Sequence, residues 1–494
     1  MKYYSTRDKT ITISPSEAII QGISKDGGLF VPKSIPQIDD LMELTKLDYR
    51  ELAYYIMSKF FTDFDPSLLK EAIIDAYGEK FSHKGVVAVE KVKDSYILEL
   101  FHGPTFAFKD MALSILPHLL RIALKANKVD KEVVILTATS GDTGKAALEG
   151  FANVEGVKIV VFFPEKGVSQ IQKLQMLTQE GDNTFVVGIE GNFDDAQRGV
   201  KAIFNDREFN EILNRQGYIL SSANSINIGR LIPQIVYYFY GYLDLLRQGE
   251  IELGEKVNIV VPTGNFGNIL AAYYGKKMGL PVNKLICASN ENNVLTDFFN
   301  RGVYDRRRKL KLTSSPSMDI LISSNLERLL FYILNEDDAA VKDKMERLNI
   351  DGYYRVQDIN IEDFYGDYST EEEVTRAIRD VFVNYNYLMD PHTAVAYSVY
   401  DKYRLRTKDD TKTIIAATAS PFKFGKKIAD SLGLNSLDKD EFQILEELGD
   451  RTGLKVPEGI SSLKDKAIRH NNYCSKEEMK DMLYKFLKVG EGHD

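Results

Sequence analysis

Short apolar runs alternate with amphipathic, helix-capable segments over most of the chain after about residue 86. The predicted strands are 133–136, 158–163, 184–189, 258–261, 285–288 and 413–417. Strands that alternate with helices at this spacing predict an α/β fold with a mostly parallel sheet covered by helices on both faces. Ligands bind such sheets at the carboxyl ends of the strands, so the loops that follow the strands are where chemistry is expected.

The regions on either side of this alternation have different patterns. Residues 1–86 combine helical patterns with a turn, and Ser16 is predicted to cap a helix that runs to about Ser24. Residues 431–494 are predicted to form helices rich in charged residues. We therefore expect a small N-terminal accessory domain over 1–86, a core of two α/β lobes over 87–430 and a helical C-terminal segment over 431–494.

The net charge of −9 over 494 residues argues against a protein that binds nucleic acid or a membrane surface, although a local cationic pocket could still bind a small anion. The apolar segment 231–246 is too short and too polar to span a membrane, so it is predicted to be a buried helix. Cys287 and Cys474 lie far apart without metal-binding spacing. We interpret both as reduced thiols, which predicts a cytoplasmic protein.

Lys109 is the candidate reactive residue. It lies in the stretch F-H-G-P-T-F-A-F-K-D-M-A-L over 101–113, where a loop is predicted to enter a buried helix. Burial lowers the pKa of a lysine, and a neutral amine can form a Schiff base with a carbonyl. The alternative is a surface lysine whose stem lies along a helix end.

A glycine-containing loop follows the predicted strand 258–261. It reads P-T-G-N-F-G-N over 262–268 and leads into a helix, so its backbone N–H groups could bind a phosphate. It lacks the GxGxxG pattern of a dinucleotide site. A structural turn that tolerates two glycines is the alternative.

Three further loops carry polar groups that could bind anions or a ring nitrogen. Ser140 and Thr143 lie in a hydroxyl-rich loop that departs from a nucleotide-hydrolase phosphate loop at two positions. Asn227 and Arg230 precede the buried helix, and Arg230 could bind a dianion with two parallel hydrogen bonds. Thr418 follows the strand 413–417 and could meet a heterocycle nitrogen. For Asn227 and Arg230 the alternative is helix capping and surface pairing, and for Thr418 it is capping of the next helix.

The histidines do not suggest a metal site. None of the six forms a pair at metal-binding spacing, and His102 is the only one expected near the candidate site. The chemistry is therefore expected to depend on an organic cofactor. A lysine for a Schiff base, a phosphate loop and a hydroxyl for a ring nitrogen together describe a pyridoxal phosphate site.

Several motifs resemble those of the threonine synthase family, and they occur in the order typical of that family. They are H-G-P-T-F-A-F-K-D around Lys109, S-G-D-T-G at 140–144, S-A-N-S-I-N-I-G-R at 222–230, P-T-G-N-F-G-N at 262–268, S-P-S-M-D-I at 315–320 and T-A-S-P-F-K-F from Thr418. The resemblance covers about residues 1–430. It implies a fold type II pyridoxal-phosphate enzyme that converts O-phospho-L-homoserine and water to L-threonine and phosphate.

The resemblance also assigns roles to individual residues. Lys109 would carry the cofactor, and Thr418 would meet its pyridine nitrogen. The cofactor phosphate would be bound by Gly264, Asn265, Phe266 and Asn268, with Gly267 allowing the close approach. Because the other binding loops must discriminate a dianionic leaving group, we expect Ser140, Thr143, Asn227 and Arg230 to bind the substrate. Ser420 departs from the family pattern, because many relatives have histidine there.

Two rival functions stay open at this point. A related phospho-lyase would release 2-oxobutyrate instead of capturing water at Cβ. A non-catalytic α/β nucleotide-binding module would use the same loops without a covalent cofactor. The sequence does not determine the oligomeric state.

Overall fold

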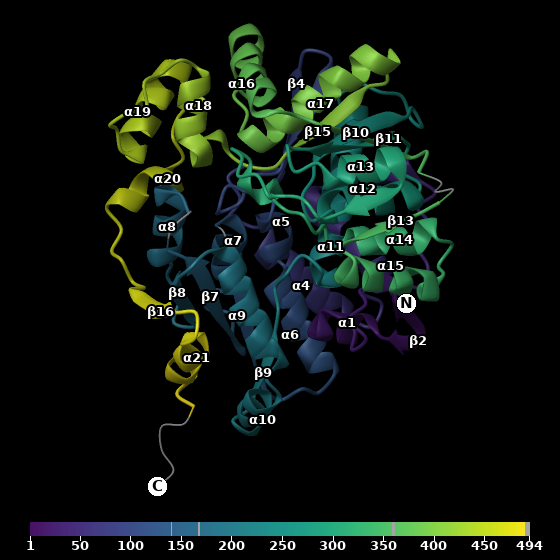
Figure 1. The fold of residues 1–494 in the computed structure, drawn as a ribbon. Coiled ribbons are helices and arrows are strands. Elements are labelled where there is room, and N and C mark those ends of the chain that lie inside the picture. The colour runs from purple at the N-terminus through teal and green to yellow at the C-terminus, as the bar shows by residue number, and fades with distance from the viewer. Residues whose placement is uncertain (140, 166–167, 358–360, 490–494) are drawn as a thin grey trace.

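A computed structural model describes residues 1–139, 141–165, 168–357 and 361–489. Two large sheets lie at the centre, with helices around them (Figure 1). The predicted α/β architecture with mostly parallel sheets is confirmed. Because each predicted strand is almost wholly apolar, it is buried on both faces, as strands of a covered parallel sheet must be.

The six-stranded sheet has the order β14-β11-β10-β15-β5-β4. Its strands are parallel except for the hairpin between β4 and β5. Their bounds are β4 (Ala88–Val92), β5 (Ser95–Glu99), β10 (Val257–Pro262), β11 (Val282–Ser289), β14 (Phe364–Tyr368) and β15 (Thr413–Ala417).

The five-stranded sheet is parallel throughout and has the order β16-β8-β7-β6-β9. Its strands are β6 (Glu132–Ala138), β7 (Val157–Pro164), β8 (Thr184–Glu190), β9 (Tyr218–Ser221) and β16 (Asn472–Ser475). All six strands predicted from the sequence are present in these two sheets, and five of them are longer at one or both ends than the apolar runs alone indicated.

The C-terminal segment is not wholly helical, in contrast to the prediction. Its strand β16 pairs in parallel with β8, so the yellow end of the chain lies beside the blue strand in Figure 1. The sequence N-Y-C-S over this strand buries only the Cys474 side chain. An edge strand with one buried residue carries no apolar run that a sequence pattern could detect.

The N-terminal region contains a small antiparallel sheet of order β2-β1-β3, formed by β1 (Tyr3–Ser5), β2 (Asp8–Ile13) and β3 (Phe30–Pro32). The predicted helix α1 (Pro15–Gln21) is present, but Ser14 caps it rather than Ser16. The reason is Pro15, which occupies the first helical position and leaves the capping place to the residue before it.

The helices before the large sheets and around the five-stranded sheet are α2 (Leu41–Leu44), α3 (Tyr49–Phe60), α4 (Pro66–Ala76), α5 (Asp110–Leu113), α6 (Leu116–Ala126), α7 (Asp142–Phe151), α8 (Gln170–Leu177), α9 (Phe193–Asn205) and α10 (Arg207–Arg215). Those that follow are α11 (Ile228–Arg247), α12 (Gly267–Lys277), α13 (Val294–Arg301), α14 (Leu326–Ile333), α15 (Asp338–Ile350), α16 (Glu371–Tyr385), α17 (Pro391–Thr407), α18 (Gly425–Ser431), α19 (Glu441–Thr452), α20 (Glu458–Ser461) and α21 (Met479–Leu487). The short elements β12 (Val303–Asp305) and β13 (Tyr353–Arg355) pair with each other, and the 3-10 turns are η1 (Pro316–Met318), η2 (Pro421–Phe424) and η3 (Ser462–Lys464).

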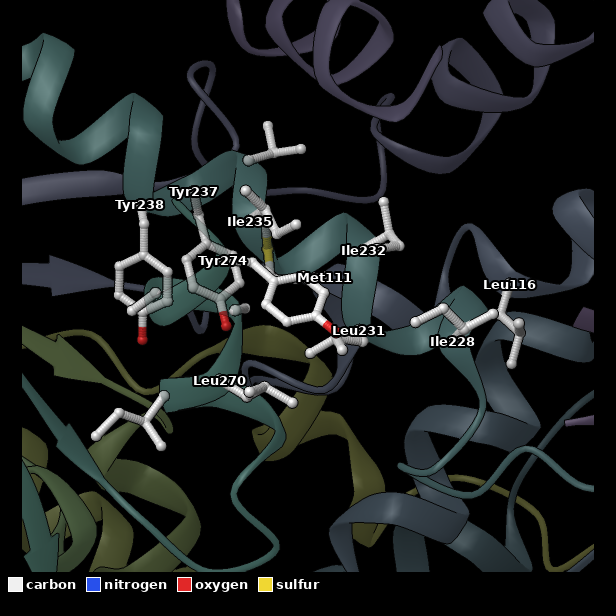
Figure 2. Close-up of a cluster of buried hydrophobic side chains, with 14 of the residues drawn as sticks. Met111, Leu116, Ile228, Leu231, Ile232, Ile235, Tyr237, Tyr238, Leu270 and Tyr274 are labelled. Atoms are coloured by element: carbon white, nitrogen blue, oxygen red, sulfur yellow. The ribbon is translucent and has the colours of Figure 1, made fainter. Parts of the chain in front are cut away.

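Helix α11 is the central buried helix. Figure 2 shows its side chains in one buried cluster with Met111, Leu116, and Leu270 and Tyr274 of α12. The prediction that 231–246 is a buried helix is confirmed. Across the described part of the chain, no helix is long and apolar enough to cross a membrane.

We expect Ile235→Ala to lower the free energy of unfolding by about 2–5 kcal/mol, because Ile235 is fully buried on α11 and the truncation leaves a cavity. The measurement is a urea titration followed by circular dichroism. Val383→Ala on the exposed face of α16 is the control and is expected to change the value by less than about 0.5 kcal/mol. Equal effects of the two substitutions would contradict the assignment of α11 to the core.

Candidate active site

The loop that carries Lys109 runs beside the end of β15. The Phe108 N–H donates to the Thr418 carbonyl at 2.8 Å, and Ala107 forms an isolated antiparallel bridge with Ala419. Lys109 itself directly precedes α5. The lysine and Thr418 therefore lie together at the carboxyl end of a strand, as expected for a site in a parallel sheet.

Lys109 is buried, with 9% of the residue exposed, so the alternative of a surface lysine is wrong. Its Nζ donates to the Ser317 Oγ at 3.1 Å and lies 3.7 Å from the Asp142 Oδ2. Burial lowers the pKa of Lys109, and the positive charges of Lys423 and Arg230 lower it further, while Asp142 opposes them. The amine is thus easier to deprotonate than an ordinary lysine.

Asp142 accepts hydrogen bonds from side chains of two other segments. The Lys423 Nζ lies 2.7 Å from its Oδ1, and the Gln172 Nε2 donates to the same oxygen at 3.0 Å. Burial by itself would raise the pKa of Asp142, but Lys423 and Lys109 outweigh burial and hold the pKa well below its usual range. Lys423 also donates to the Thr105 carbonyl at 2.8 Å, so this fully buried cation is satisfied.

The glycine loop leads from β10 into α12 through a close backbone approach. A Cβ on Gly264 would lie 2.7 Å from the Ser317 carbonyl oxygen, so no larger residue fits there without a shift. The Gly264 carbonyl accepts from the Ser323 Oγ at 2.7 Å, and the Asn265 carbonyl accepts from the Asn325 N–H at 3.1 Å. These bonds fix the loop before any ligand binds.

Two further residues of this loop are unusual. Phe266 is buried with φ of 65°, a left-handed conformation that non-glycine residues rarely adopt, directly before α12 begins at Gly267. The Asn268 Oδ1 accepts from the Tyr237 and Tyr238 hydroxyls at 2.6 and 2.5 Å. Among the described residues, its buried Nδ2 has no hydrogen-bond partner. The loop thus holds an unused donor at a helix N-terminus, which suits a phosphate.

Arg230 is a second unused donor. It is 4% exposed, and its Nη1 donates to the Ala223 carbonyl at 2.9 Å. Its buried Nε has no partner within the described part of the chain. Burial lowers the pKa of Arg230 to about 10, so the guanidinium is still charged at neutral pH. A buried cation with an unsatisfied N–H group is suited to an anionic ligand.

These features fit a cofactor that carries both an aldehyde and a phosphate. The lysine amine has a lowered pKa, the glycine loop packs closely against Ser317 beside that amine, and the Asn268 amide keeps a donor without a partner among the described residues. The described residues contain no group of three or more His, Cys, Asp or Glu side chains that could hold a metal ion.

The other predicted site residues have different surroundings. Thr143 is half-buried in the first turn of α7, beside Asp142. The Asn227 amide is engaged within the fold, since its Oδ1 accepts from the Gly229 N–H and its Nδ2 donates to the Ile19 carbonyl, both at 2.9 Å. Ser420 is buried beside the lysine loop, and its N–H donates to the Phe106 carbonyl at 3.0 Å. Ser140 lies outside the described residues.

Four residues that contact the lysine or its neighbours were missed from the sequence: Asp142, Ser317, His392 and Lys423. The expectation that His102 is the only histidine near the site is wrong, because the His392 ring is bonded to Ser317, whereas the His102 Nε2 pairs with the Glu99 Oε2 at 2.9 Å. Asp142, Ser317 and Lys423 lie in the motifs S-G-D-T-G, S-P-S-M-D-I and T-A-S-P-F-K-F. These motifs were the sequence signal from which the three residues could have been found. His392 lies in none of them.

Asp110 opens α5 directly after Lys109 and is buried against the lysine loop. Its carboxyl accepts from the Thr105 N–H at 2.8 Å and from the Thr105 hydroxyl at 2.5 Å. A Cβ on Gly103 would lie 2.5 Å from the Asp110 Cβ, so only glycine allows this packing. Burial raises the pKa of Asp110 to about 6, although the two bonds from Thr105 oppose it.

Three family models match this chain. A model described as pyridoxal-phosphate dependent enzyme matches residues 91–419. Models described as threonine synthase N terminus and threonine synthase, C-terminal, match residues 2–77 and 393–469.

Similar proteins cover most of the chain. Threonine synthase-like 1 of Homo sapiens is 42% identical over 456 residues, which cover 89% of this chain and 61% of the human protein, so the chain spans less than two thirds of this relative. Threonine synthase of Saccharomyces cerevisiae is 37% identical over 490 residues, covering 92% of this chain and 93% of the yeast protein. The crystal structure of PLP-bound threonine synthase from Brucella melitensis has a TM-score of 0.88 at 33% identity and covers 100% of both chains. The predicted fold type II architecture is confirmed by these matches.

We expect Asp110→Asn to remove a pH-dependent part of the stability. Because the folded state holds the proton of Asp110 with a pKa of about 6, above the unfolded value of 3.8, this contribution is full below pH 4 and is lost as the pH rises through 6. The loss amounts to roughly 3 kcal/mol at most. Urea unfolding between pH 4 and pH 7 measures it.

The exposed carboxyl of Asp130 provides the control for this experiment. In Asp130→Asn, the free energy of unfolding is expected to depend on pH as it does in the unmodified protein. In Asp110→Asn, this dependence is expected to be flatter between pH 4 and pH 6. Parallel profiles for the unmodified protein and Asp110→Asn would show that Asp110 ionises in the folded protein as it does in the unfolded chain.

Proposed function

The chain belongs to the threonine synthase family of pyridoxal-phosphate-dependent enzymes, and we propose that it converts O-phospho-L-homoserine and water into L-threonine and phosphate. The reaction would eliminate phosphate at Cγ and add water at Cβ. The observation that carries the proposal is the pair of unused donors at Asn268 and Arg230. Together they match a substrate and a cofactor that each bring a phosphate.

In this proposal the chain's residues divide between the cofactor and the substrate. Lys109 anchors pyridoxal 5'-phosphate, and Thr418 meets its ring nitrogen. The cofactor phosphate is bound by Gly264, Asn265, Phe266, Gly267 and Asn268. Thr143, Asn227, Arg230 and Ser140, the last outside the described residues, bind the substrate. Of these, Arg230 has the strongest support, because it is a buried cation whose Nε has no partner among the described residues, whereas the Asn227 amide is already engaged with Gly229 and Ile19.

The residues around Lys109 support a role as the base. When bound, pyridoxal phosphate withdraws electrons from the bound amino acid and makes protons on Cα and then Cβ removable. The amine of Lys109 removes both protons, and its lowered pKa increases the neutral fraction that can do so. Arg230 binds the phosphate at Cγ as it leaves, because a guanidinium stabilises the dianion.

We also propose a division of the chain into domains, a class of partner and a cellular location. Residues 1–86 form the accessory domain, 87–430 the catalytic core and 431–494 the C-terminal segment. The partner is a small-molecule substrate, and neither nucleic acid nor a membrane takes part. We propose a cytoplasmic location, based on the two free cysteines, which are both buried.

The purified protein with pyridoxal phosphate and O-phospho-L-homoserine provides the direct test. We expect threonine and phosphate in equal amounts, together with a visible absorption band that Lys109→Ala lacks. Formation of 2-oxobutyrate and ammonia without threonine would support the phospho-lyase and overturn the proposal. A colourless protein that does not bind pyridoxal phosphate would favour the nucleotide-binding module.

We expect Arg230→Lys to lower kcat/KM for O-phospho-L-homoserine by about 10- to 100-fold, since a lysine keeps the charge but loses the planar pair of donors. Steady-state kinetics of phosphate release measures the change. Arg121→Lys is the matched control, because the Arg121 side chain is half exposed and pairs only loosely with Glu155 at 3.9 Å. Unchanged kinetics of Arg230→Lys would remove Arg230 from the substrate site.

A further inference from the structure

Ser317 lies in η1, between Lys109 and the glycine loop. Its Oγ accepts from the Lys109 Nζ at 3.1 Å, and its carbonyl oxygen lies 2.7 Å from where a Cβ on Gly264 would be. One residue therefore contacts both the reactive amine and the loop proposed to bind the cofactor phosphate. A displacement of Ser317 would disturb both contacts.

A buried histidine holds Ser317 through its backbone. The Ser317 N–H donates to the His392 Nε2 at 3.3 Å, and the His392 Nδ1 lies 2.7 Å from the Asp390 Oδ1. Because a carboxylate only accepts, Nδ1 carries the proton and donates to Asp390, which leaves the Nε2 lone pair for Ser317. The two bonds thus require the same neutral tautomer of His392.

Asp390 is itself fixed at the start of α17. It caps the helix by accepting from the His392 N–H at 2.9 Å and from the Thr393 N–H at 3.3 Å, and it also accepts from the Thr393 hydroxyl. Asp390 and His392 are both buried. The other side of η1 is held by Asp319, which accepts from the Thr313 N–H at 2.9 Å. Ser317 therefore has little freedom to move.

We propose that Ser317 is a catalytic residue that holds the free amine of Lys109 toward the substrate, and that His392 and Asp390 are positioning residues that fix Ser317. This inference rests on the proposed role of Lys109 as the base. A hydroxyl suits the task because it orients the amine without the strong rise in pKa that a carboxylate at the same distance would cause. Asp142, at 3.7 Å, is the competing partner of the amine.

The test measures the amine of Lys109 directly in the cofactor-free protein. An amine-acylating reagent labels Lys109, and the rate is followed by peptide mass spectrometry between pH 6 and pH 11. Ser317→Ala removes an acceptor of the ammonium, so the labelling midpoint is expected to move to lower pH. Below the midpoint, labelling is expected to be about three- to tenfold faster than in the unmodified protein. The charged neighbours Asp142, Lys423 and Arg230 are unchanged.

Two matched controls separate this contact from general effects of the substitution. Ser314 lies in the same loop, but its Oγ donates to the Glu371 Oε1 at 3.0 Å and not toward Lys109, so Ser314→Ala is expected to keep the midpoint. His470 is another buried histidine, bonded to the Gln179 carbonyl at 2.9 Å, so His470→Gln is expected to keep it too. Circular dichroism checks that each variant is folded.

Two variants of His392 test the positioning role. His392→Ala removes the acceptor of the Ser317 N–H and is expected to shift the midpoint in the same direction as Ser317→Ala. His392→Gln places an amide oxygen near the former Nε2, so its midpoint is expected to lie between those of His392→Ala and the unmodified protein. If His392→Ala fails to fold, His392→Gln can still be compared with Ser317→Ala. The midpoint of His392→Gln is expected to lie between those of Ser317→Ala and the unmodified protein.

An unchanged midpoint in Ser317→Ala would overturn the proposal, as would equal shifts in Ser317→Ala and Ser314→Ala. A shift in Ser317→Ala with none in either His392 variant would overturn the positioning role alone. The labelling requires neither cofactor nor substrate. A failure to form threonine would therefore count against the proposed function, whereas the labelling result would count for or against Ser317 independently.

Discussion

The site depends on a buried ion pair between two segments, one following a strand of each large sheet. Asp142 comes from the first turn of α7, beside the five-stranded sheet, whereas Lys423 comes from η2, which follows β15 of the six-stranded sheet. Either charge alone would be costly to bury, so the pair stabilises the contact of these two segments only while both members are present. Lys109 is the second cation beside the same carboxylate. The position and the pKa of the Lys109 amine are therefore linked to how these two segments pack.

The same region keeps donors that the fold does not use. In the described part of the chain, the Asn268 Nδ2 and the Arg230 Nε are buried without partners, although most buried polar groups in proteins are hydrogen-bonded. Each costs stability for as long as it stays without a partner. Phe266, in its left-handed conformation, adds local strain at the same loop. The glycine loop thus combines an unpartnered donor with a strained backbone, and both lower the stability of the free protein.

Sequence patterns predicted the parts of the structure that are continuous in the chain. The buried strands and α11 were found because apolar runs and helical periodicity are local signals. The buried position of Lys109 before a helix and the entry of the glycine loop into α12 were predicted from local patterns too. Ser317 and His392 were not predicted as site residues. Lys109 and Ser317 are 208 positions apart and Ser317 and His392 are 75 apart, and contacts over such distances in sequence leave no periodic pattern. The hydrogen bonds of the Asn227 amide within the fold could not be predicted either. An asparagine before a helix gives the same sequence pattern whether its side chain faces a ligand or a backbone group.

Strand β16 has a consequence for how the protein is made. It lies on the outer side of β8, and the bond from the Asn472 side chain to the Val186 carbonyl spans 286 residues of sequence. The other four strands of this sheet lie between residues 132 and 221. During synthesis on the ribosome these four strands can pair early, but the outer edge of β8 stays open until residues 472–475 have emerged. An open strand edge is a template for pairing with other chains, so the nascent protein passes through a long interval in which this edge needs protection from aggregation.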